Sequence, residues 1–498
     1  MEGAKTFSSL GRLRSGAFGR GWLRSGASSL GCSRHVRLSR VKSKATPRSI
    51  LFISPTGDFS NGAEISVFQL MKVLAEKGNR VFNVYPAYAP GAEAAYRIAL
   101  SDAGITPICI PELRWWPDAP GGDINTPPDA PADLAAIDKI AEIISANSVD
   151  TVITNTVNIY HGALAAAAKN VHHIWLIHEY PEGEFGYYRN KVPFISDCSD
   201  ALFCVEGTLR SCLEPLLEGR KIATFLPYTN PSEALAESSA CSLDHKEKEP
   251  DKQTMSLQKR IVCIGLISER KNQLELLCAY ALLVEKLEVC ELHACESQAP
   301  KPREFKSQVP KSREPEPQVP ELLKPKPQVP ELVFIGGDGD DGAYRRLCDD
   351  FIERRGLTRV SFVGHIENPW AFISERDIVV LPSKAETFGC VYAEALMCGV
   401  PVIASDNPGF AAVKRLFGTG RLYPRGDACA LSQAIKETLA NLDAEKEAAL
   451  SSAPRVRAAF DAHNAYAQVI AAVMSNKAPR AKKRYDGTQL NELIVKPS

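Results

Sequence analysis

Two long stretches of the chain alternate short β-rich runs with amphipathic helices, and this pattern constrains the fold more than any other feature of the 498 residues. The stretches cover about residues 49–230 and 259–455. At the start of the first, a buried strand over 49–54 precedes a loop over 55–62 and a helix over 63–77. Strands that alternate with helices are typical of parallel sheets. The sequence therefore predicts an α/β protein with two such sheets.

The helix over 63–77 is predicted by the spacing of its apolar residues. One face of that helix is formed by Val67, Leu70, Met71 and Leu74. These positions follow the i, i+3, i+4, i+7 pattern of a helix that buries one side. Gly78 then ends the helix, because glycine tolerates the backbone conformation that follows a last helical turn.

Four further segments have the composition of tails, linkers or insertions. Residues 1–48 hold eight Arg and three Lys against one acidic residue, Glu2. Such a segment is typical of an organellar transit peptide or of a disordered basic arm, and the sequence leaves both open. Residues 296–330 repeat Gln-Val-Pro at ten-residue intervals, which favours an extended surface insertion. We expect a linker over 231–258 and a polar tail over 476–498.

Composition argues against several classes of protein. No run of apolar residues approaches the roughly 18–20 that a membrane-spanning helix needs, so we expect a soluble or surface-bound protein. The 14 Cys residues are scattered without a Cys-x-x-Cys pair, which argues against a disulfide framework and against zinc. The formal net charge is zero, and no large basic stretch overlays the two periodic regions. Nucleic acid is therefore not an expected partner.

Candidate binding residues follow several of the predicted strands. In open α/β sheets, ligands bind beyond the carboxyl ends of the strands. His178 directly follows a strand over 174–177, and the Gly-containing loop at 55–62 opens a helix whose N-terminus suits an anion. In the second stretch, Arg270 and Lys271 follow a strand over 260–265, an arrangement that suits a diphosphate or, alternatively, a solvated pair of cations.

A glycine-rich segment over 336–342 contains Asp338 and Asp340, which invites a metal-binding interpretation. A calcium loop needs further ligands and a Glu at its twelfth position, where Asp349 stands here. We therefore expect a glycine-rich turn and no metal ligands.

The strongest signal lies over residues 378–405, where strand, loop, helix and strand follow in order. Glu386 lies in the loop, and Glu394 is a lone carboxylate in an otherwise apolar helix that we expect from about Phe388 to Gly399. A buried charge needs a partner, and ligand hydroxyls can supply one. The first N–H groups of the helix, those of Phe388, Gly389 and Cys390, can bind phosphate. A ligand that has hydroxyls at both ends and phosphates between them would fit these protein groups. A nucleotide sugar has this composition.

These residues resemble the motifs of the family 4, GT-B-fold, retaining glycosyltransferases over about residues 49–475. Glu386-x7-Glu394, with Phe388-Gly389 inside it, is similar to the family's hallmark element. Further elements in the same order are Gly62-Ala63-Glu64, Gly265 with Lys271, Gly336-Gly337-Asp338-Gly339, Phe362-Val363-Gly364 and Gly399-Val400-Pro401-Val402. Two positions depart from the family pattern: Leu266 replaces an Arg, and Asn61 replaces a Gly. Asn tolerates positive φ better than most residues, so the turn can survive this replacement.

The resemblance implies two Rossmann-like domains that face each other across a cleft. Residues 49–230 would form the acceptor domain, residues 259–455 the nucleotide-sugar domain, and a helix over 456–475 would return to the first domain. The roles implied for single residues are diphosphate binding by Lys271 with Arg270, ribose binding by Glu394, sugar-hydroxyl binding by Glu386, phosphate approach by the N–H of Gly62, and a place beside the sugar for His178.

The activity implied is retaining transfer of a hexose-type sugar to a hydroxyl of a glycan or lipid-linked acceptor. In this family the acceptor attacks from the leaving-group side, so neither a protein nucleophile nor a metal cofactor is expected. The expected location is the cytoplasm, with possible peripheral membrane association, and organellar targeting by residues 1–48 stays open.

Three other functions are alternatives to this one. An inactive GT-B scaffold or binding subunit is the main alternative. An epimerase or phosphorylase of the same fold is a second, which the Glu-x7-Glu element disfavours. A dinucleotide-dependent oxidoreductase is discarded, because no Gly-x-Gly-x-x-Gly opens either first helix.

Overall fold

The computed structural model describes residues 46–59, 61–119, 130–229, 231, 259–296, 329–339, 342–366, 368–475, 477–480 and 482. The basic tail expected over 1–48, the linker over 231–258, the insertion over 296–330 and the polar tail over 476–498 lie mostly outside these residues. Residues 47–498 form one compact unit by their contacts.

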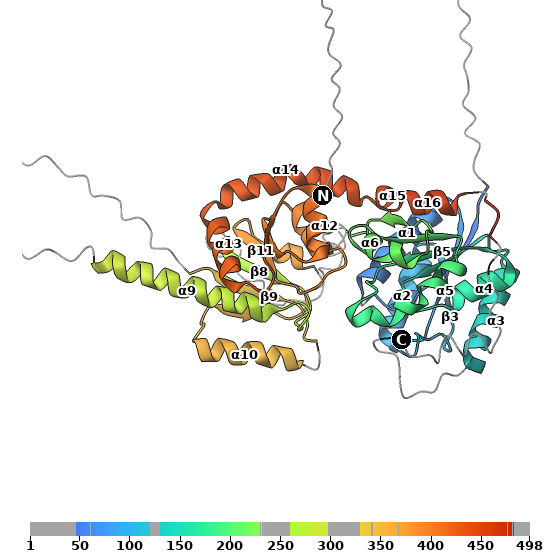
Figure 1. The fold of residues 1–498 in the computed structure, drawn as a ribbon, viewed down its shortest axis with the longest axis horizontal. Helices are drawn as coiled ribbons and strands as arrows, with labels where there is room; N and C mark the ends of the chain where they lie inside the picture. The colour runs from blue at the N-terminus through green and yellow to red at the C-terminus, as the bar shows by residue number, and fades with distance from the viewer. Residues whose placement is uncertain are drawn as a thin grey trace, which may run out of the picture. The chain divides into compact units, whose positions relative to one another are not determined.

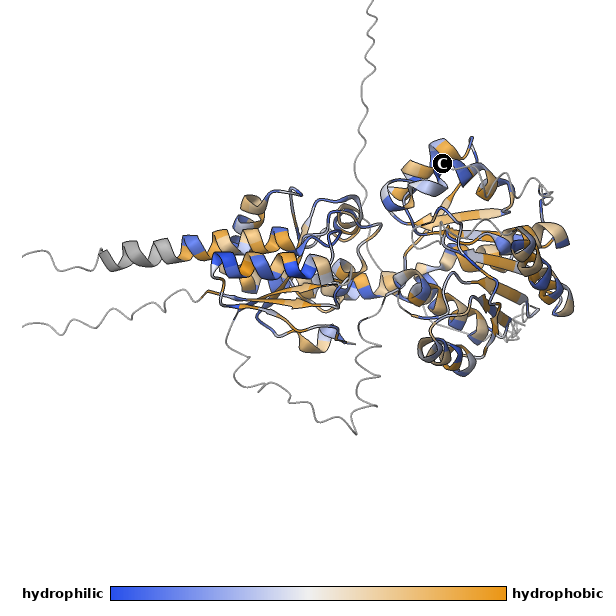
Figure 2. Ribbon diagram, turned by 90° about the horizontal axis from the view of Figure 1, so that it is seen from below, coloured by the Kyte–Doolittle hydropathy of each residue, from blue (hydrophilic) through white to orange (hydrophobic). Residues whose placement is uncertain are grey.

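The first sheet has seven parallel strands in the order β3-β2-β1-β4-β5-β6-β7. The strands are β1 (Ser49–Ile53), β2 (Arg80–Tyr85), β3 (Ile105–Cys109), β4 (Thr151–Asn155), β5 (His172–Ile177), β6 (Ala201–Val205) and β7 (Ala223–Phe225). Every residue of β1 and of β4 is buried, as expected for central strands with helices on both faces. Figure 2 shows strands coloured predominantly as hydrophobic.

The second sheet has six parallel strands in the order β10-β9-β8-β11-β12-β13. The strands are β8 (Arg260–Ile264), β9 (Glu331–Ile335), β10 (Val360–Phe362), β11 (Asp377–Leu381), β12 (Val402–Ser405) and β13 (Arg421–Tyr423). The prediction of an α/β protein with two parallel sheets is therefore confirmed.

Helices connect the strands in chain order (Figure 1). They are α1 (Gly62–Glu76), α2 (Pro90–Asp102), α3 (Ala130–Ala146), α4 (His161–Lys169), α5 (Val192–Asp197), α6 (Leu209–Leu213), α9 (Gln273–Glu296), α10 (Ala343–Arg355), α11 (Cys390–Met397), α12 (Pro408–Phe417), α13 (Ala428–Ala440), α14 (Leu442–Phe460), α15 (Ala462–Ala465) and α16 (Ala467–Val473). Short 3-10 helices are η1 (Gly183–Lys191), η2 (Glu214–Leu216) and η4 (Pro369–Phe372).

The apolar face predicted for α1 is buried against the first sheet. Val67, Leu70, Met71 and Leu74 are each 0% exposed. Gly78 follows the helix with φ +84, a conformation that L side chains rarely adopt.

The strand orders place one switch point in each sheet. In the first sheet β1 lies between β2 and β4, so connections leave in opposite directions on its two sides. In the second sheet β8 lies between β9 and β11 in the same way. Ligands of open α/β sheets bind at the carboxyl ends of the strands at such points. A ligand site is therefore expected at the loops after β1 and β4 in the first sheet, and at the loops after β8 and β11 in the second.

The last helices of the chain pack against elements of the first sheet. Helix α15 packs against α1, and α16 packs against β7 (Figure 1). The hydroxyls of Ser66 and Tyr466 share a hydrogen bond, and the Leu226 N–H donates to the Ala465 carbonyl at 3.3 Å. The rings of Phe225 and Tyr466 stack with centroids 5.5 Å apart. The chain thus returns from the second sheet to the first.

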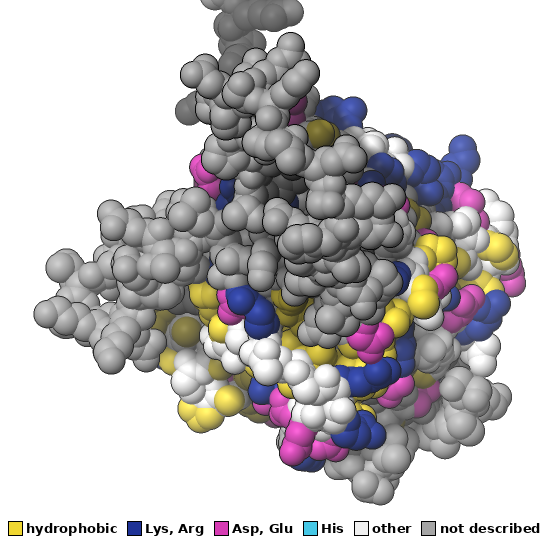
Figure 3. All heavy atoms as spheres, turned by 90° about the vertical axis from the view of Figure 1, so that its left-hand side faces the viewer, with side chains coloured by type: hydrophobic (Ala, Val, Ile, Leu, Met, Phe, Trp, Pro, Cys, Tyr) yellow, Lys and Arg dark blue, Asp and Glu magenta, His cyan; other side chains and the backbone are white. Residues whose placement is uncertain are grey.

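Two surface properties bear on partners. Among the described residues, no helix combines the length and apolar character needed to cross a membrane. On the face drawn in Figure 3, Lys and Arg side chains are interspersed with Asp and Glu side chains.

Candidate active site

An ion pair joins the loops that follow the adjacent strands β8 and β11. Lys271 Nζ lies 2.6 Å from Glu386 Oε1, and Arg270 Nη1 lies 3.4 Å from Glu386 Oε2. The Lys271 and Glu386 side chains are only 17% and 13% exposed, whereas Arg270 is 48% exposed. Because solvent screens exposed pairs, Lys271 is the stronger partner. The structure thus brings together three of the predicted site residues at the switch point of the second sheet.

The pKa of Glu386 lies below its ordinary value. Burial alone acts to raise this pKa, but the charges of Lys271 and Arg270, with hydrogen bonds from Lys271 and Ser383, outweigh burial. Glu386 is therefore a carboxylate at neutral pH, able to accept hydrogen bonds from hydroxyls.

Glycines let the loops after β8 and β9 approach closely. Gly336 has φ +156, and a Cβ added there would lie 2.0 Å from the Gly265 carbonyl oxygen. The two loops then pair at Ile267 and Asp338. A Cβ added at Gly265 would lie 3.6 Å from Lys271 Cδ, so the Lys271 stem passes over this glycine. Gly336 is thus required for the close approach of the two loops, one of which carries Lys271.

The described part of the glycine-rich segment forms a turn. Asp338 lies 3.7 Å from Arg345 Nη1, and Gly342 takes φ +75. Asp340 is outside the described residues. Among the residues that the structure does describe, no group of three His, Cys, Asp or Glu side chains is placed to hold a metal ion.

Glu394 lies on α11, and each of its oxygens accepts a hydrogen bond from a neutral donor. The Thr229 hydroxyl donates to Oε1, and the Trp370 indole N–H donates to Oε2 at 3.0 Å. Burial raises the pKa of Glu394, while these two hydrogen bonds and the more distant charge of Lys271 act in the opposite direction. The lone carboxylate predicted from the sequence thus has partners, but neither of them carries a positive charge.

Helix α11 begins at Cys390, two residues later than predicted. Gly389 caps the helix with φ +96, and a Cβ there would lie 2.4 Å from the Phe410 ring. The first helical N–H groups are therefore those of Cys390 and Val391, and Phe388 precedes the cap. The Phe388 ring is buried and packs 5.8 Å from the Phe460 ring, so its side chain belongs to the core.

In the first sheet, the predicted Gly62 is the first residue of α1. Asn61 does not adopt the positive φ that Asn tolerates, because its φ is −126. Its side-chain oxygen instead accepts a hydrogen bond from the Glu64 N–H at 2.8 Å, so Asn61 is the N-cap of the helix. The N–H of Gly62 keeps its place at the helix N-terminus, where an anion is favoured.

Glu64 is a fully buried carboxyl that sequence reasoning named without giving it a role. Its Oε1 accepts hydrogen bonds from Ser54 Oγ at 2.6 Å and from the Tyr96 hydroxyl at 2.5 Å. Its Oε2 lies 3.4 Å from Asn155 Nδ2, at the end of β4. Burial raises the pKa of Glu64 to about 7 despite these hydrogen bonds. The network ties α1 to β1 and β4 at the switch point of the first sheet.

His178 directly follows β5, as predicted, and is 9% exposed. Its ring contacts Phe225 edge-on at 5.1 Å, and Nε2 has no hydrogen-bond partner among the described residues. Burial lowers the pKa of His178 to about 3, so the ring is neutral at neutral pH. A neutral imidazole can accept or donate one hydrogen bond at a ligand hydroxyl.

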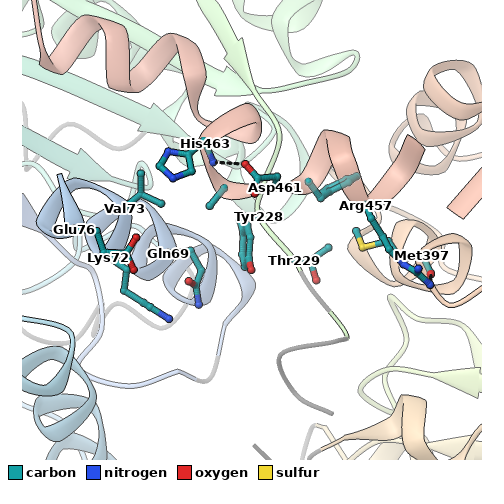
Figure 4. Close-up of a pocket in the computed structure, with 12 residues that line it drawn as sticks. Gln69, Lys72, Val73, Glu76, Tyr228, Thr229, Met397, Arg457, Asp461 and His463 are labelled. Carbon is teal, nitrogen blue, oxygen red and sulfur yellow. Dashed lines mark hydrogen bonds between the residues drawn. The ribbon is translucent and has the colours of Figure 1, made fainter. Parts of the chain in front are cut away.

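A cavity of about 370 Å³ is lined in part by Thr229, the hydrogen-bond partner of Glu394 (Figure 4). Its walls come from α1, the segment after β7, and helices α11, α14 and α15. The labelled lining residues are Gln69, Lys72, Val73, Glu76, Tyr228, Thr229, Met397, Arg457, Asp461 and His463. None of the predicted site residues lines it, but its wall residue Thr229 donates to Glu394. The cavity is thus a neighbour of the predicted site.

Sequence reasoning missed Trp370 and Thr229, the two partners of Glu394. They stand 24 and 165 positions away from Glu394 in the chain. The only signal in the sequence was the need of an isolated carboxylate for a partner.

A known protein family matches the part of the chain that forms the second sheet from β9 onward. A family model described as glycosyl transferases group 1 matches residues 318–455. Over 112 residues the chain is 32% identical to a phosphatidyl-myo-inositol mannosyltransferase of Mycobacterium leprae, covering 22% of this chain and 29% of that protein. Over 79 residues it is 37% identical to an N-acetyl-alpha-D-glucosaminyl L-malate synthase of Bacillus anthracis, covering 16% of this chain and 21% of that protein. The chain therefore aligns with less than a third of each relative.

Solved structures are similar over nearly their whole length. A glycosyltransferase of Rickettsia africae superposes with a TM-score of 0.60 at 16% identity, covering 87% of this chain and 100% of that one. The Anabaena protein HepE, in complex with UDP and glucose, superposes with a TM-score of 0.58 at 15% identity, covering 86% and 99%. The fold is GT-B, as predicted. The family model and the mannosyltransferase relative support the predicted enzyme class, a glycosyltransferase, for the part of the chain that they match.

Proposed function

We propose that the protein is a retaining glycosyltransferase, which moves a hexose-type sugar from a nucleoside diphosphate sugar to a hydroxyl of a glycan or lipid-linked acceptor. The observation that carries the proposal is the 2.6 Å pair of Lys271 and Glu386 at the switch point, with Glu394 on the helix that follows. The cation can bind a diphosphate, and the two carboxylates can each accept hydrogen bonds from hydroxyls on either side of it. Two further facts support it: HepE was solved with UDP and glucose, and the named relatives include a mannosyltransferase.

In the proposed reaction, the bond between sugar C1 and the phosphate oxygen breaks, and its electron pair stays on the diphosphate. The acceptor oxygen forms a bond to C1 on the same face, and its proton passes to a phosphate oxygen. Lys271, Arg270 and the N-terminus of α11 stabilise the negative charge that develops on the leaving group. No protein nucleophile takes part.

The other residues bind and orient the substrates. Glu394 accepts hydrogen bonds from the ribose, and Glu386 accepts them from the hydroxyls of the sugar. The Gly62 N–H approaches the phosphates from the first domain. His178, neutral because its pKa is low, accepts or donates a hydrogen bond at the sugar or acceptor.

The proposal assigns charge neutralisation to the side chains and to helix N-termini, and includes no metal cofactor. It places the enzyme in the cytoplasm, with peripheral membrane contact where the acceptor is lipid-linked.

The test is binding and turnover across a panel of nucleoside diphosphate sugars with the full chain. Wild type is compared with Glu394→Ala and with Glu269→Ala, a control at an exposed carboxylate that pairs with Lys384 on the surface. We expect one donor to raise the melting temperature and to release nucleotide in wild type and in the control, but not in Glu394→Ala. The anomeric configuration of the product, read by NMR, tests retention.

Failure of every donor in folded wild-type protein would overturn the proposal. The result would favour the alternative of an inactive GT-B scaffold or binding subunit.

A further inference from the structure

Asn368 is buried, with 7% of the residue exposed. Neither Oδ1 nor Nδ2 of its side-chain amide has a hydrogen-bond partner in the described part of the chain. Among the residues that the structure describes, no other side-chain amide has both of its polar atoms buried and unpaired. Asn368 stands at the N-cap of η4, where an Asn side chain commonly caps the helix, yet it makes no cap hydrogen bond. The side-chain amide of Asn368 therefore does not stabilise the turn through a hydrogen bond.

An amide in this state costs the folded protein free energy, because it has left water without finding a partner. Native proteins keep few such groups, and each that persists calls for an explanation. A side-chain amide presents a donor and an acceptor next to each other. Its complement is a ligand edge that also carries an acceptor and a donor side by side.

The place of Asn368 connects it with the proposed donor site. Trp370, two residues later in the same turn, donates its indole N–H to Glu394 Oε2 at 3.0 Å. Glu394 is the proposed ribose ligand, so the turn that holds Asn368 borders the nucleoside. In a nucleotide, the base is joined to the ribose and carries adjacent donors and acceptors along its hydrogen-bonding edge.

We infer that Asn368 recognises the base of the donor nucleotide and thereby determines which nucleotide the protein accepts. Nδ2 donates to a carbonyl oxygen or ring nitrogen of the base, and Oδ1 accepts from the adjacent N–H. The inference rests on the proposed function, in which Glu394 holds the ribose. It explains why the free protein keeps an unpaired amide: the partner arrives with the nucleotide.

The experiment is calorimetric titration of the full chain with UDP, GDP, ADP, CDP and inorganic diphosphate. Wild type is compared with Asn368→Ala, Asn368→Asp and the contrasting variant Asn407→Ala. Asn407 is a buried Asn whose amide is spent on structure, since it caps α12 by accepting from the Phe410 N–H at 3.1 Å.

We expect wild type to prefer one base. Asn368→Ala should lower affinity for the preferred nucleotide about 10- to 100-fold, the discrimination typical of a well-formed pair of hydrogen bonds to a base. It should leave diphosphate affinity unchanged and should not lower the melting temperature, because no hydrogen bond of the free protein is lost. Asn407→Ala should lower the melting temperature and keep the base preference. Asn368→Asp replaces the donor with an acceptor and should also abolish the preference.

Each remaining outcome has a distinct meaning. Wild type that binds no nucleotide contradicts the proposed function itself. Wild type that binds all four nucleotides equally, or variants at Asn368 that both keep the wild-type preference, would overturn this inference and leave the proposed function standing.

Discussion

The indole N–H of Trp370 donates to Glu394 Oε2 at 3.0 Å, which links the turn before β11 to helix α11. A second neutral donor, the Thr229 hydroxyl, holds the other oxygen. Neutral donors fix the orientation of a carboxylate without cancelling its charge. Glu394 is thus held in place while its pKa stays raised by burial. This arrangement makes the site sensitive to the loss of either donor.

Trp370→Phe removes the indole N–H that donates to Glu394 and keeps an aromatic ring at this position. Because a hydrogen bond to the carboxylate favours its charged form, its loss raises the pKa of Glu394 further. Donor nucleotide affinity, which needs the carboxylate, should fall about 5- to 10-fold at pH 7, the worth of one hydrogen bond. Its decline on acidification should begin at a higher pH than in wild type. Titration of nucleotide between pH 5 and 8 measures both effects.

The matched control is Trp116→Phe, which removes an indole N–H that donates to the Val157 carbonyl in the first domain. This variant should lose stability and keep the wild-type pH dependence of binding. If the Trp370 and control variants shift the pH dependence equally, the orienting role of Trp370 is wrong.

Thr229→Val tests whether the Thr229 hydroxyl competes with a ribose hydroxyl of the nucleotide for Glu394 Oε1. In the free variant this oxygen loses its partner, so a ribose hydroxyl that replaces it gains free energy. The lost hydrogen bond also raises the pKa of Glu394, so the comparison is made at the alkaline end of a titration between pH 7 and 9, where the carboxylate is most fully charged. There, nucleotide affinity should rise about 3- to 10-fold, on the basis of about 1 kcal/mol per hydrogen bond. Titration calorimetry gives the ratio, and a fall in affinity at the alkaline end would instead make Thr229 a direct ligand of the nucleotide.

Lys271→Gln should weaken binding of a nucleoside diphosphate about 10- to 100-fold, since a charged hydrogen bond to phosphate is lost. Affinity for the corresponding nucleoside, which lacks phosphates, should stay within about 2-fold. Competition titrations with both ligands measure the two values. Lys384→Gln is the control, because Lys384 is exposed and pairs at 2.8 Å with Glu269 on the surface. Equal losses in the two variants would contradict a specific role for Lys271.

Glu64→Gln should change how stability depends on pH. The folded pKa of Glu64 is about 7 against an ordinary value of 4.5, so between these values the folded state binds more protons than the unfolded state. The free energy of unfolding contributed by Glu64 is therefore largest below about pH 4.5 and declines as pH rises toward 7. The slope is at most about 1.4 kcal/mol per pH unit. Urea unfolding of both proteins at pH 5, 6, 7 and 8 gives the difference.

Glu179 has a pKa raised by burial to about 7 as well, so the slope of the wild type alone does not isolate Glu64. The difference between wild type and Glu64→Gln does. Parallel curves for the two proteins would show that Glu64 is ionised in both states.

Local pattern was enough to predict much of this fold and part of the site. The face of α1 formed by Val67, Leu70 and Met71 follows from helical spacing, and the position of His178 follows from the strand before it. The meeting of Lys271 with Glu386 was foreseeable, because both follow apolar strands and parallel strands end at one edge of a sheet.

Other features depend on contacts that no local pattern encodes. Thr229 and Glu394 meet across 165 positions, and a threonine carries no mark that singles it out for such a contact. The start of α11 is set by the approach of the Phe410 ring to Gly389, which requires the tertiary fold. An Asn can adopt a positive φ or cap a helix. Asn61 caps α1, because its side-chain oxygen accepts a hydrogen bond from the Glu64 N–H.

The return of α15 and α16 to the first sheet has a consequence for synthesis on the ribosome. Tyr466, Val469 and Val473 are each 0% exposed, and α16 packs on β7, which ends at Phe225. Roughly 240 residues separate Phe225 from Tyr466, and translation of that length takes tens of seconds. The first domain to leave the ribosome is thus covered by residues that are translated long after its own last strand. Until then its nascent chain presents an apolar surface that chaperones can bind, and a message cut short before Tyr466 leaves that surface uncovered for good.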